Sequence, residues 1–463
     1  MGNSASLFYS SDPEKQTLHR RVAPNARQLE LLQSRWQELR DFLESYLSDV
    51  TGCDVRTWIQ GSYKFGTLIR PVRSSDEFDV DLGIYVVWEG DHDLFSPDDL
   101  KGFVQDALIA FKESHDDVTK VADPPKERCC RIHYKQNFHI DVPVYHLDPR
   151  TNRRRLATST RGWEFSDPRA IYIWFRDRAS GHDRLRRLIR YLKAWAALTF
   201  PQDAGRPSSI MLTVLAAQLY GINAIRNADG DDDALAALLD QLARHFNQSR
   251  AVPNPVAPDE DLNRLTDQQF IAFRTALVRA AEGAARGIAA NDALTSYAAW
   301  SDIFGYLFPG SDALPATATR ANLPVAVVTP EISVRVVSTK PAHLVGTYVN
   351  FVPPIPKGCD LFFSITNPEA IPVDATVEWV VRNEGDEAED TNDLGHFASR
   401  GSTRSMTATE SSAYRGKHYM DCVIRRWGQI IGGRRVPVTI QAHSFPVRNP
   451  PRPAFVQHRK GGR

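Results

Sequence analysis

Three aspartates carry the clearest chemistry in this sequence. Asp79 and Asp81 lie in an alternating run of acidic and apolar residues, 77–84, so a strand there would place both carboxylates on one face. Two residues along a strand span about 6.6 Å, where two unneutralised charges repel by about 2.5 kcal/mol at an effective dielectric of about 20. Asp141 lies in a second alternating run, 140–144. We expect the three aspartates to form a cage of hard oxygen ligands suited to Mg²⁺.

A candidate phosphate site precedes the acids. The motif is Gln60-Gly61-Ser62, and Ser62 begins the run 62–68. This run predicts a short helix whose first N–H groups are directed at an anion. The alternative is that the two neighbouring aspartates are solvated strand residues and that Ser62 is an ordinary helix cap. The Gly-Ser motif, the strand with Asp79 and Asp81, and the strand with Asp141 occur in a consistent order and place their polar groups on a common face. This agreement favours the phosphate site.

This order of motifs resembles the nucleotidyltransferases of the DNA polymerase β superfamily. The resemblance implies that Asp79 and Asp81 hold two Mg²⁺ ions, with Mn²⁺ as a substitute, and that Asp141 helps to activate a ribose hydroxyl. The hydroxyl would attack the α-phosphate of a nucleoside triphosphate in line, while residues 60–62 bind the nucleotide.

A second pair of candidate residues lies downstream. Leu185, Leu188, Ile189, Leu192 and Trp195 predict an amphipathic helix, with Lys193 at the border of its apolar stripe. Further along the chain, Ser209 precedes the apolar run 210–217.

This arrangement resembles the cyclic GMP-AMP synthase-like enzymes, the CD-NTases or SMODS family of bacterial anti-phage signalling. There a lysine and a serine at such positions hold the donor triphosphate, which makes Lys193 and Ser209 the matches here. The alternatives are a snorkelling surface lysine for Lys193 and a plain N-cap for Ser209. Unlike animal cyclic GMP-AMP synthase, the chain has Ile210 after the serine and lacks a zinc-binding thumb insertion.

Two further patterns have a simpler interpretation. Cys129, Cys130, His133 and His139 lack a Cys-x-x-Cys pair and lie in strands leading to Asp141, so packing within the sheet is expected. The acidic run 229–233 lacks the spacing of metal ligands and is interpreted as a solvated turn.

Composition places the chain among soluble globular proteins. Of its 463 residues, 42% are hydrophobic and 24% charged, and Lys plus Arg equals Asp plus Glu at 56 each. With no net charge, the molecule as a whole has no electrostatic attraction that would indicate a nucleic acid partner. Five scattered cysteines, no signal peptide and no bilayer-length apolar run indicate a cytoplasmic protein without membrane contact.

We expect an α+β protein with several parts. Residues 1–182 would form the catalytic lobe with an N-terminal spine helix, and residues 183–310 a helical lobe. A linker at 311–324 would precede a β-rich sensor domain at 325–447 and a basic tail at 448–463, which the composition predicts to be disordered. The spine helix is predicted from the leucines and tryptophan at its 3–4 spacing: Leu29, Leu32, Trp36, Leu39, Leu43 and Leu47.

The C-terminal part predicts an all-β sandwich or barrel. Two of its segments, 377–385 and 410–419, resemble the adenylyl/guanylyl and SMODS sensor domain. The expected strands are 325–337, 348–352, 361–366, 376–382, 419–425 and 436–441.

The motifs themselves indicate nucleotidyl transfer. The resemblance further implies synthesis of a cyclic di- or trinucleotide messenger from ATP, GTP or both, an activating ligand at the sensor domain, and a downstream effector that binds the product. The alternatives are a linear product, as from an oligoadenylate synthase or an RNA-tailing enzyme, and a non-catalytic nucleotide- or RNA-binding sensor. The intact carboxylates favour catalysis.

Overall fold

The chain divides into two compact units, residues 1–322 and 323–463. The computed structural model describes residues 2–90, 94–310, 328–399, 404–427 and 429–441. The predicted linker at 311–324 and the predicted tail at 448–463 lie outside the described residues. No helix of the described residues is both long and apolar enough to span a membrane.

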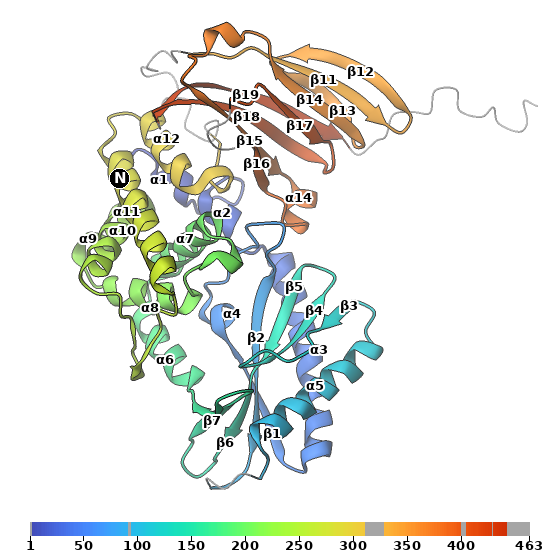
Figure 1. Cartoon of the computed structure of the whole chain (residues 1–463), viewed down its shortest axis with the longest axis vertical. Helices are drawn as coiled ribbons and strands as arrows, with labels where there is room; N and C mark the ends of the chain where they lie inside the picture. The colour runs from blue at the N-terminus through green and yellow to red at the C-terminus, as the bar shows by residue number, and fades with distance from the viewer. Residues whose placement is uncertain (1, 91–93, 311–327, 400–403, 428, 442–463) are drawn as a thin grey trace, which may run out of the picture. The chain divides into compact units, whose positions relative to one another are not determined.

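An eight-stranded mixed sheet organises the first half of unit one, in the order β3-β4-β5-β2-β6-β7-β8, with β1 also paired to β2 (Figure 1). Its central strand β2 pairs in parallel with β5 at its beginning and with β6 further along. The strands are β1 (Asp54–Gln60), β2 (Phe78–Val87), β3 (Val118–Val121), β4 (Cys130–Tyr134), β5 (Phe138–Val142), β6 (Val144–Leu147), β7 (Arg154–Thr158) and β8 (Gly162–Phe165).

Two helices, α3 (Ala26–Thr51) and α5 (Pro97–Glu113), cover one face of this sheet (Figure 1). A capping box between Asn25 and Gln28 begins α3, and Gly52 in the left-handed conformation ends it. The predicted spine helix is therefore present. Leu29 is the exception in its predicted stripe, because it is 40% exposed while the later leucines are buried in the core.

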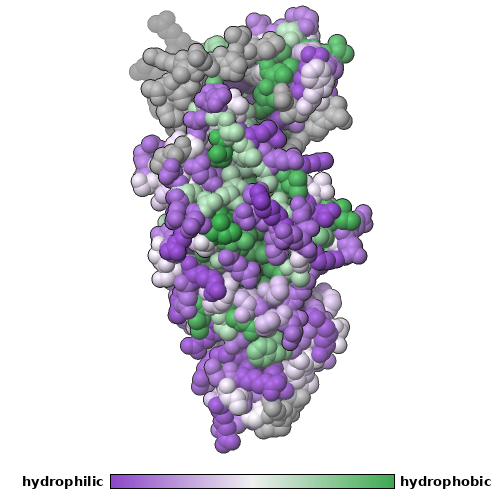
Figure 2. Space-filling view, turned by 90° about the vertical axis from the view of Figure 1, so that its left-hand side faces the viewer, coloured by the Kyte–Doolittle hydropathy of each residue, from purple (hydrophilic) through white to green (hydrophobic). Residues whose placement is uncertain are grey.

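Helices dominate the rest of unit one. The stripe predicted on α7 (Asp183–Thr199) is buried as expected. The other helices are α1 (Ala5–Phe8), α2 (Leu18–Val22), α4 (Gly61–Phe65), α6 (Pro168–Ala179), α8 (Ser209–Leu219), α9 (Asn223–Arg226), α10 (Asp231–Gln248), α11 (Asp267–Ala289) and α12 (Ala293–Phe304), with short 3₁₀ turns η1 (Gln202–Ala204) and η2 (Gly305–Leu307) and the strand pair β9 (Pro253–Asn254) and β10 (Ala257–Asp261). Hydrophilic residues predominate on the face shown in Figure 2, with smaller hydrophobic areas between them.

The acidic run 229–233 is not a solvated turn throughout. Asp231 begins α10 and is buried, where it accepts hydrogen bonds from Arg184, Arg187 and the Tyr191 hydroxyl. Asp232 is also buried. The expectation for this run is therefore wrong, because arginines of α7 neutralise Asp231 from another element.

Unit two is a β sandwich with one continuous apolar core between its sheets. One sheet has the order β12-β11-β14-β17 and the other β13-β19-β18-β15-β16. The strands are β11 (Ile332–Thr339), β12 (Ala342–Val349), β13 (Val352–Pro356), β14 (Cys359–Ile365), β15 (Thr376–Glu384), β16 (Gly395–Ser399), β17 (Thr407–Ser411), β18 (Gly416–Arg426) and β19 (Gln429–Gln441), with a 3₁₀ turn η4 (Pro368–Ala370) and a short helix α14 (Asp386–Asp390).

The overall α+β class, with a strand-rich C-terminal part, is as predicted, but individual strands differ. The predicted strand 348–352 is interrupted at Asn350, whose positive φ of 64° turns the chain from β12 to β13. Only the last two residues of β12 were predicted as strand, and β16 and β17 were not predicted at all. Both are short strands at sheet edges, with less regular apolar alternation than the central strands.

Candidate active site

The three predicted aspartates lie on one face of the central sheet. Phe78, Val80 and the other alternate residues of β2 are buried in the core with α3 and α5, so Asp79 and Asp81 project from the opposite face. The parallel pairing of β2 with β5 sets Asp81 beside Asp141. The alternation seen in the sequence therefore becomes a cluster of carboxylates.

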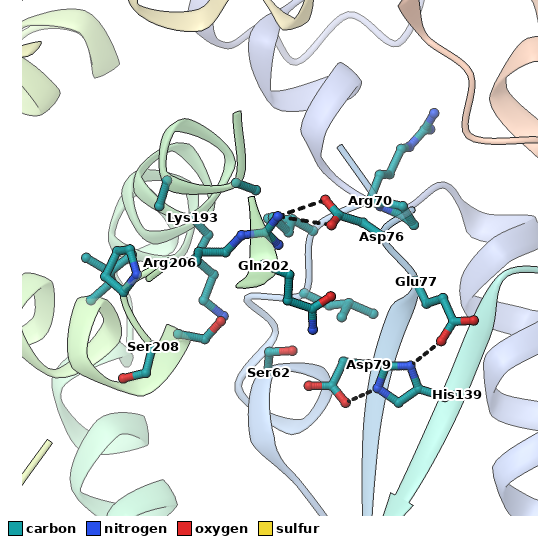
Figure 3. Close-up of a pocket in the computed structure, with 18 of the residues that line it drawn as sticks. Ser62, Arg70, Asp76, Glu77, Asp79, His139, Lys193, Gln202, Arg206 and Ser208 are labelled. Atoms are coloured by element: carbon teal, nitrogen blue, oxygen red, sulfur yellow. Dashed lines mark hydrogen bonds and ion pairs between the residues drawn. The ribbon is translucent and has the colours of Figure 1, made fainter. Parts of the chain in front are cut away.

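Two cationic side chains hold two of these carboxylates. The Arg131 guanidinium makes a two-pronged contact with Asp141, including a bond of 2.7 Å from Nη2 to Oδ2. His139 contacts Asp79 through Nε2 at 2.9 Å and Glu77 through Nδ1 at 2.7 Å (Figure 3). Burial alone would lower the pKa of His139, but the hydrogen bonds to Asp79 and Glu77 raise it to about 9. In the absence of a metal ion, these two hydrogen bonds therefore favour the protonated imidazole of His139.

Asp81 is the carboxylate of the cluster to which neither Arg131 nor His139 is bonded. Its enclosure, followed by the charges of Asp79 and Asp141, raises its pKa well above the usual value. For Asp79 enclosure also acts to raise the pKa, but the hydrogen bond and charge of His139 and the charge of Arg131 lower it. Asp81 is thus the carboxylate of the cluster whose negative charge is least stabilised by the surrounding protein.

Gly61 gives Asp81 its space. Gly61 has φ of +59°, and a Cβ there would lie 1.8 Å from Asp81 Oδ2. A larger residue would suffer both a strained backbone and a collision with the carboxylate. The glycine of the predicted phosphate motif is therefore required by the neighbouring acid, a role that the sequence alone did not indicate.

A cavity of about 290 Å³ extends from the carboxylates towards the helices (Figure 3). Of the predicted residues, it brings together Ser62, Asp79, Lys193 and Ser209. Of the remaining predicted residues, Asp81 and Asp141 follow Asp79 on the same face of the sheet. Two serine hydroxyls, the amino group of Lys193 and the carboxylate of Asp79 therefore line the same cavity.

Lys193 is buried, not at the border of the apolar stripe, because only 5% of it is exposed. Its Nζ lies 3.2 Å from both the carbonyl oxygen and the hydroxyl of Thr67. Burial, followed by the charge of Arg190, lowers the pKa of Lys193 to about 7. The alternative of a snorkelling surface lysine is therefore wrong.

Lys193 belongs to a series of hydrogen bonds that joins α7 to the segment after α4. Arg190 Nε donates to the Leu68 carbonyl at 3.1 Å, one turn before the lysine. In the opposite direction, Arg73 donates to the carbonyls of Ala197 and Leu198 at the end of α7. We call these contacts of Arg73, Arg190 and Lys193 the cation–carbonyl ladder; it fixes residues 67–73 along the cavity.

Ser209 is the first residue of α8, and the N-cap is Ser208. The Ser208 hydroxyl accepts a hydrogen bond from the Met211 N–H at 3.3 Å. The alternative interpretation of Ser209 as a plain N-cap is therefore wrong, because its neighbour performs the capping. Ser209 lines the cavity, where its phosphate role stays a prediction.

Gln60 is buried within the sheet. Its Nε2 donates to the Tyr85 hydroxyl at 3.0 Å and its Oε1 accepts from the Tyr145 hydroxyl at 3.2 Å. A Cβ on Gly83, the residue that packs beneath it, would lie 1.8 Å from Gln60 Nε2. These contacts assign the Gln60 side chain a positioning role at the end of β1; contact with a nucleotide stays a prediction.

Several residues of this site were not predicted from the sequence. His139 does more than pack in the sheet, since it bridges Glu77 and Asp79. Its position two residues before Asp141 on the same strand face was the available signal. Cys129 and Cys130 are buried as expected, and burial, their largest influence, raises the pKa of both thiols.

Asp76 and Arg206 form a second missed pair, on the cavity wall (Figure 3). Arg206 Nη2 lies 3.0 Å from Asp76 Oδ1, and Arg206 Nε donates to the Phe200 carbonyl. The two residues are 130 positions apart in sequence, and neither belongs to a recognisable motif. The pair joins the segment before β2 to the segment before α8.

The donor set fits a divalent cation. Ligand atoms of Asp79, His139 and Asp141 all lie within 4.8 Å of one another, and Asp81 adds a further carboxylate beside them. The repulsion that raises the pKa of Asp81 is the force that a bound cation would remove.

Two family models match the chain. Residues 55–145, which include all three aspartates, match the nucleotidyltransferase domain of the DncV-like cyclic GMP-AMP synthases. Residues 316–441 match the adenylyl/guanylyl and SMODS C-terminal sensor domain.

Curated relatives carry related names. A cyclic GMP-AMP synthase of Escherichia albertii is 28% identical over 445 residues, covering 95% of this chain and 96% of the relative. A c-di-GMP synthase of Roseivirga ehrenbergii is 27% identical over 286 residues, covering 54% of this chain and 73% of the relative.

Solved structures share the fold. The Vibrio cholerae DncV cyclic AMP-GMP synthase in complex with the linear intermediate 5′ pppA(3′,5′)pG has a TM-score of 0.57 at 19% identity, covering 64% of this chain and 94% of that one. Together with the matched domains and the carboxylate cluster, these similarities favour an enzyme over a non-catalytic sensor. The chain is a nucleotidyltransferase that resembles the CD-NTase (SMODS) enzymes both in its catalytic domain and in its adenylyl/guanylyl and SMODS C-terminal sensor domain.

Proposed function

We propose that this enzyme makes a cyclic di- or trinucleotide messenger from nucleoside triphosphates. The observation that carries the proposal is the carboxylate cluster of Asp79, Asp81 and Asp141 at one end of a cavity that also contains Ser62, Lys193 and Ser209. Groups that hold a cation and groups that attract phosphate thus share one space. This is the arrangement that transfer of a nucleotidyl group requires.

Asp79, Asp81 and Asp141 would hold two Mg²⁺ ions, for which Mn²⁺ is a substitute. Bound there, the ions would supply activation of the attacking hydroxyl and neutralisation of the leaving pyrophosphate. Arg131 keeps Asp141 in place through two hydrogen bonds, and His139 holds Asp79 through one.

Lys193 supplies positive charge to the triphosphate. It is buried, its charge is disfavoured there, and a phosphate group would restore the charge-assisted hydrogen bonds that Thr67 offers only as neutral oxygens. Ser62 and Ser209 line the same cavity and can donate from their hydroxyls. ATP, GTP or both are the expected substrates.

Cyclisation is favoured over a linear product by the relatives. Those named above are cyclic dinucleotide synthases, and the Vibrio cholerae enzyme was solved with a linear dinucleotide named as its intermediate. A second transfer at the same site, with the linear product as both donor and acceptor, would close the ring. By the same resemblance, the C-terminal unit would respond to an activating ligand and the product would act on a downstream effector in anti-phage defence.

The test is product analysis with labelled nucleotides. Purified full-length protein is incubated with ATP and GTP in Mg²⁺ or Mn²⁺, and the products are treated with phosphatase. A cyclic product has no terminal phosphate and keeps its label. Asp79→Asn combined with Asp81→Asn should lower turnover to about one-thousandth or less, because several kcal/mol of metal-dependent stabilisation is lost.

Two exposed aspartates of α3, Asp41 and Asp49, provide the matched control. Changing both to Asn alters the net charge equally and should leave turnover unchanged. A product that phosphatase degrades completely would favour the linear alternative. Undiminished turnover in the Asp79 and Asp81 variant would end the assignment of these carboxylates to catalysis.

A further inference from the structure

A second group of metal-ligand side chains adjoins the carboxylate cluster. Glu77, His133 and His139 each direct a donor atom at the others, and these atoms lie within 4.8 Å of one another. His133 and His139 face each other across the paired strands β4 and β5, and Glu77 directly precedes β2. The backbone pairing of three strands therefore brings the three side chains together.

The spacing of the donors is close to that of ligands around one ion. His133 Nδ1 lies 3.0 and 3.3 Å from the two Glu77 oxygens, and His139 Nδ1 lies 2.7 Å from Oε2. Ligands 2.0–2.1 Å from a tetrahedral Zn²⁺ are about 3.3 Å apart, so only a small outward shift would be needed. The exposed fractions of 22% for His133 and 30% for Glu77 leave a side open to water as a fourth ligand.

We propose that Glu77, His133 and His139 form a binding site for a transition-metal ion of the Zn²⁺ class, separate from the Mg²⁺ cluster. Two imidazole nitrogens and one carboxylate oxygen are the donor set that such ions prefer, whereas Mg²⁺ favours oxygen ligands alone. Three protein ligands with an open position are also typical of zinc sites that retain a water molecule.

His139 would connect the two metal sites. Its Nδ1 faces Glu77 and His133, while its Nε2 lies 2.9 Å from Asp79. A metal ion bound at Nδ1 would displace the proton from that nitrogen and release it to solvent. Histidines that bind a metal through one nitrogen commonly donate the other N–H to a carboxylate, which fixes the ring. Here that carboxylate is Asp79, so an ion at this site would fix the orientation of a residue of the Mg²⁺ cluster.

Nearby positive charge does not fill the site. Arg131 lies on the same strand as His133, but its guanidinium is bonded to the Asp141 carboxylate. Asp79, Asp81, Asp141 and Glu77 are four carboxylates, and Arg131 is the one guanidinium bonded to any of them in the described part of the chain. The local field favours entry of a divalent ion.

Cobalt provides a direct probe, since Co²⁺ takes the ligands of Zn²⁺ and has visible absorption. Full-length protein stripped with chelator is titrated with Co²⁺ in excess Mg²⁺, without nucleotide, so that Mg²⁺ competes for the all-oxygen ligands. We expect one equivalent of Co²⁺ to give d–d absorption, and Zn²⁺ to displace it. His133→Ala should weaken Co²⁺ binding at least about tenfold, and Glu77→Gln should do likewise.

His343→Ala, at an exposed histidine of the sandwich unit, is the matched control and should bind Co²⁺ as the wild type does. Far-UV circular dichroism verifies that each variant is folded. Equal Co²⁺ affinity in the wild type, His133→Ala and Glu77→Gln, or no stoichiometric binding in the wild type, would overturn the proposal. Because the readout needs no turnover, its failure is distinguishable from failure of the proposed function.

Discussion

The pKa of an aspartate is shifted in opposite directions in the two units of the chain. In the sandwich, Asp421 accepts hydrogen bonds from Arg382 at 2.9 Å and from Arg435 at 2.6 and 2.7 Å. Burial alone would raise the pKa of Asp421, but the two arginines lower it. In the catalytic unit, enclosure and neighbouring carboxylates raise the pKa of Asp81.

The difference separates a structural carboxylate from a functional one. Asp421 has all the cations that it needs within its own unit, so it is complete when the sandwich is folded. The cluster around Asp81 has more carboxylates than cations, so it is complete only when a cation arrives from solution. Asp421 is buried and Asp81 is half-buried, but the balance of charge within each site is what separates their roles.

Asp421→Asn and Asp81→Asn should change stability in opposite directions. Loss of Asp421 leaves Arg382 and Arg435 enclosed without an anion and should destabilise the sandwich by about 3–5 kcal/mol. Loss of Asp81 removes repulsion and should stabilise the catalytic sheet by about 2 kcal/mol at neutral pH. Hydrogen exchange of peptides from β18 and β2, in full-length protein with chelator, measures both.

The pH dependence sharpens this prediction. The folded-state pKa of Asp421 is lowered, so its stabilising contribution is present above the usual value of 3.8 and is lost as the pH falls. The folded-state pKa of Asp81 is raised, so the catalytic sheet loses stability as the pH rises above 3.8. Equal signs in the two variants, or equal pH slopes, would contradict the comparison.

Lys193→Ala should weaken binding of nucleoside triphosphate by about 10- to 150-fold at pH 6. A hydrogen bond to a charged group is worth about 1.5–3 kcal/mol, and each 1.36 kcal/mol is a factor of ten. Because the pKa of Lys193 is lowered to about 7, wild-type affinity should fall as the pH rises from 6 to 9. Calorimetry in Mg²⁺ should show that the variant loses most of this pH dependence.

Lys112, an exposed lysine near the end of α5, supplies the matched control. Lys112→Ala should keep both the affinity and the pH profile of the wild type. If Lys193→Ala also keeps them, Lys193 serves only to bind Thr67 and the triphosphate role is wrong.

Removal of the sandwich should have the smallest effect on nucleotide binding. A chain that ends at Asn322 keeps every residue of the carboxylate cluster and of the cavity, since both lie in unit one. We expect its triphosphate affinity by calorimetry to remain within about threefold of the full chain, while basal synthesis or response to an activator changes. Aggregation, or loss of nucleotide binding, would show that the sandwich is required to build the catalytic unit.

The sequence predicted best where one local pattern decides the structure. Alternation placed Asp79 and Asp81 on one strand face, and the 3–4 spacing of leucines gave α3 and α7. It failed where the partner is distant in sequence. The burial of Lys193 depends on Thr67, 126 residues away, and that of Asp231 on arginines of α7.

The same limit applies to the candidate site. Gly61 and Ser62 were found because their spacing to the acids is a motif, whereas Asp76 and Arg206 belong to none. His139 was visible as an alternating neighbour of Asp141, but its bridge between two carboxylates depends on where β2 lies beside β5. In the sandwich, the regular central strands were predicted and the edge strands were largely missed.

The cation–carbonyl ladder also has an electrical consequence. Arg190 and Lys193 donate to uncharged oxygen atoms, so these acceptors hold the two cations without cancelling their charge. The segment is thus held in place, and the positive potential of Lys193, when it is protonated, reaches the cavity that it lines. The same contacts that give rigidity would draw a polyanion inward, and the association rate of a nucleoside triphosphate would fall as added salt screens that potential.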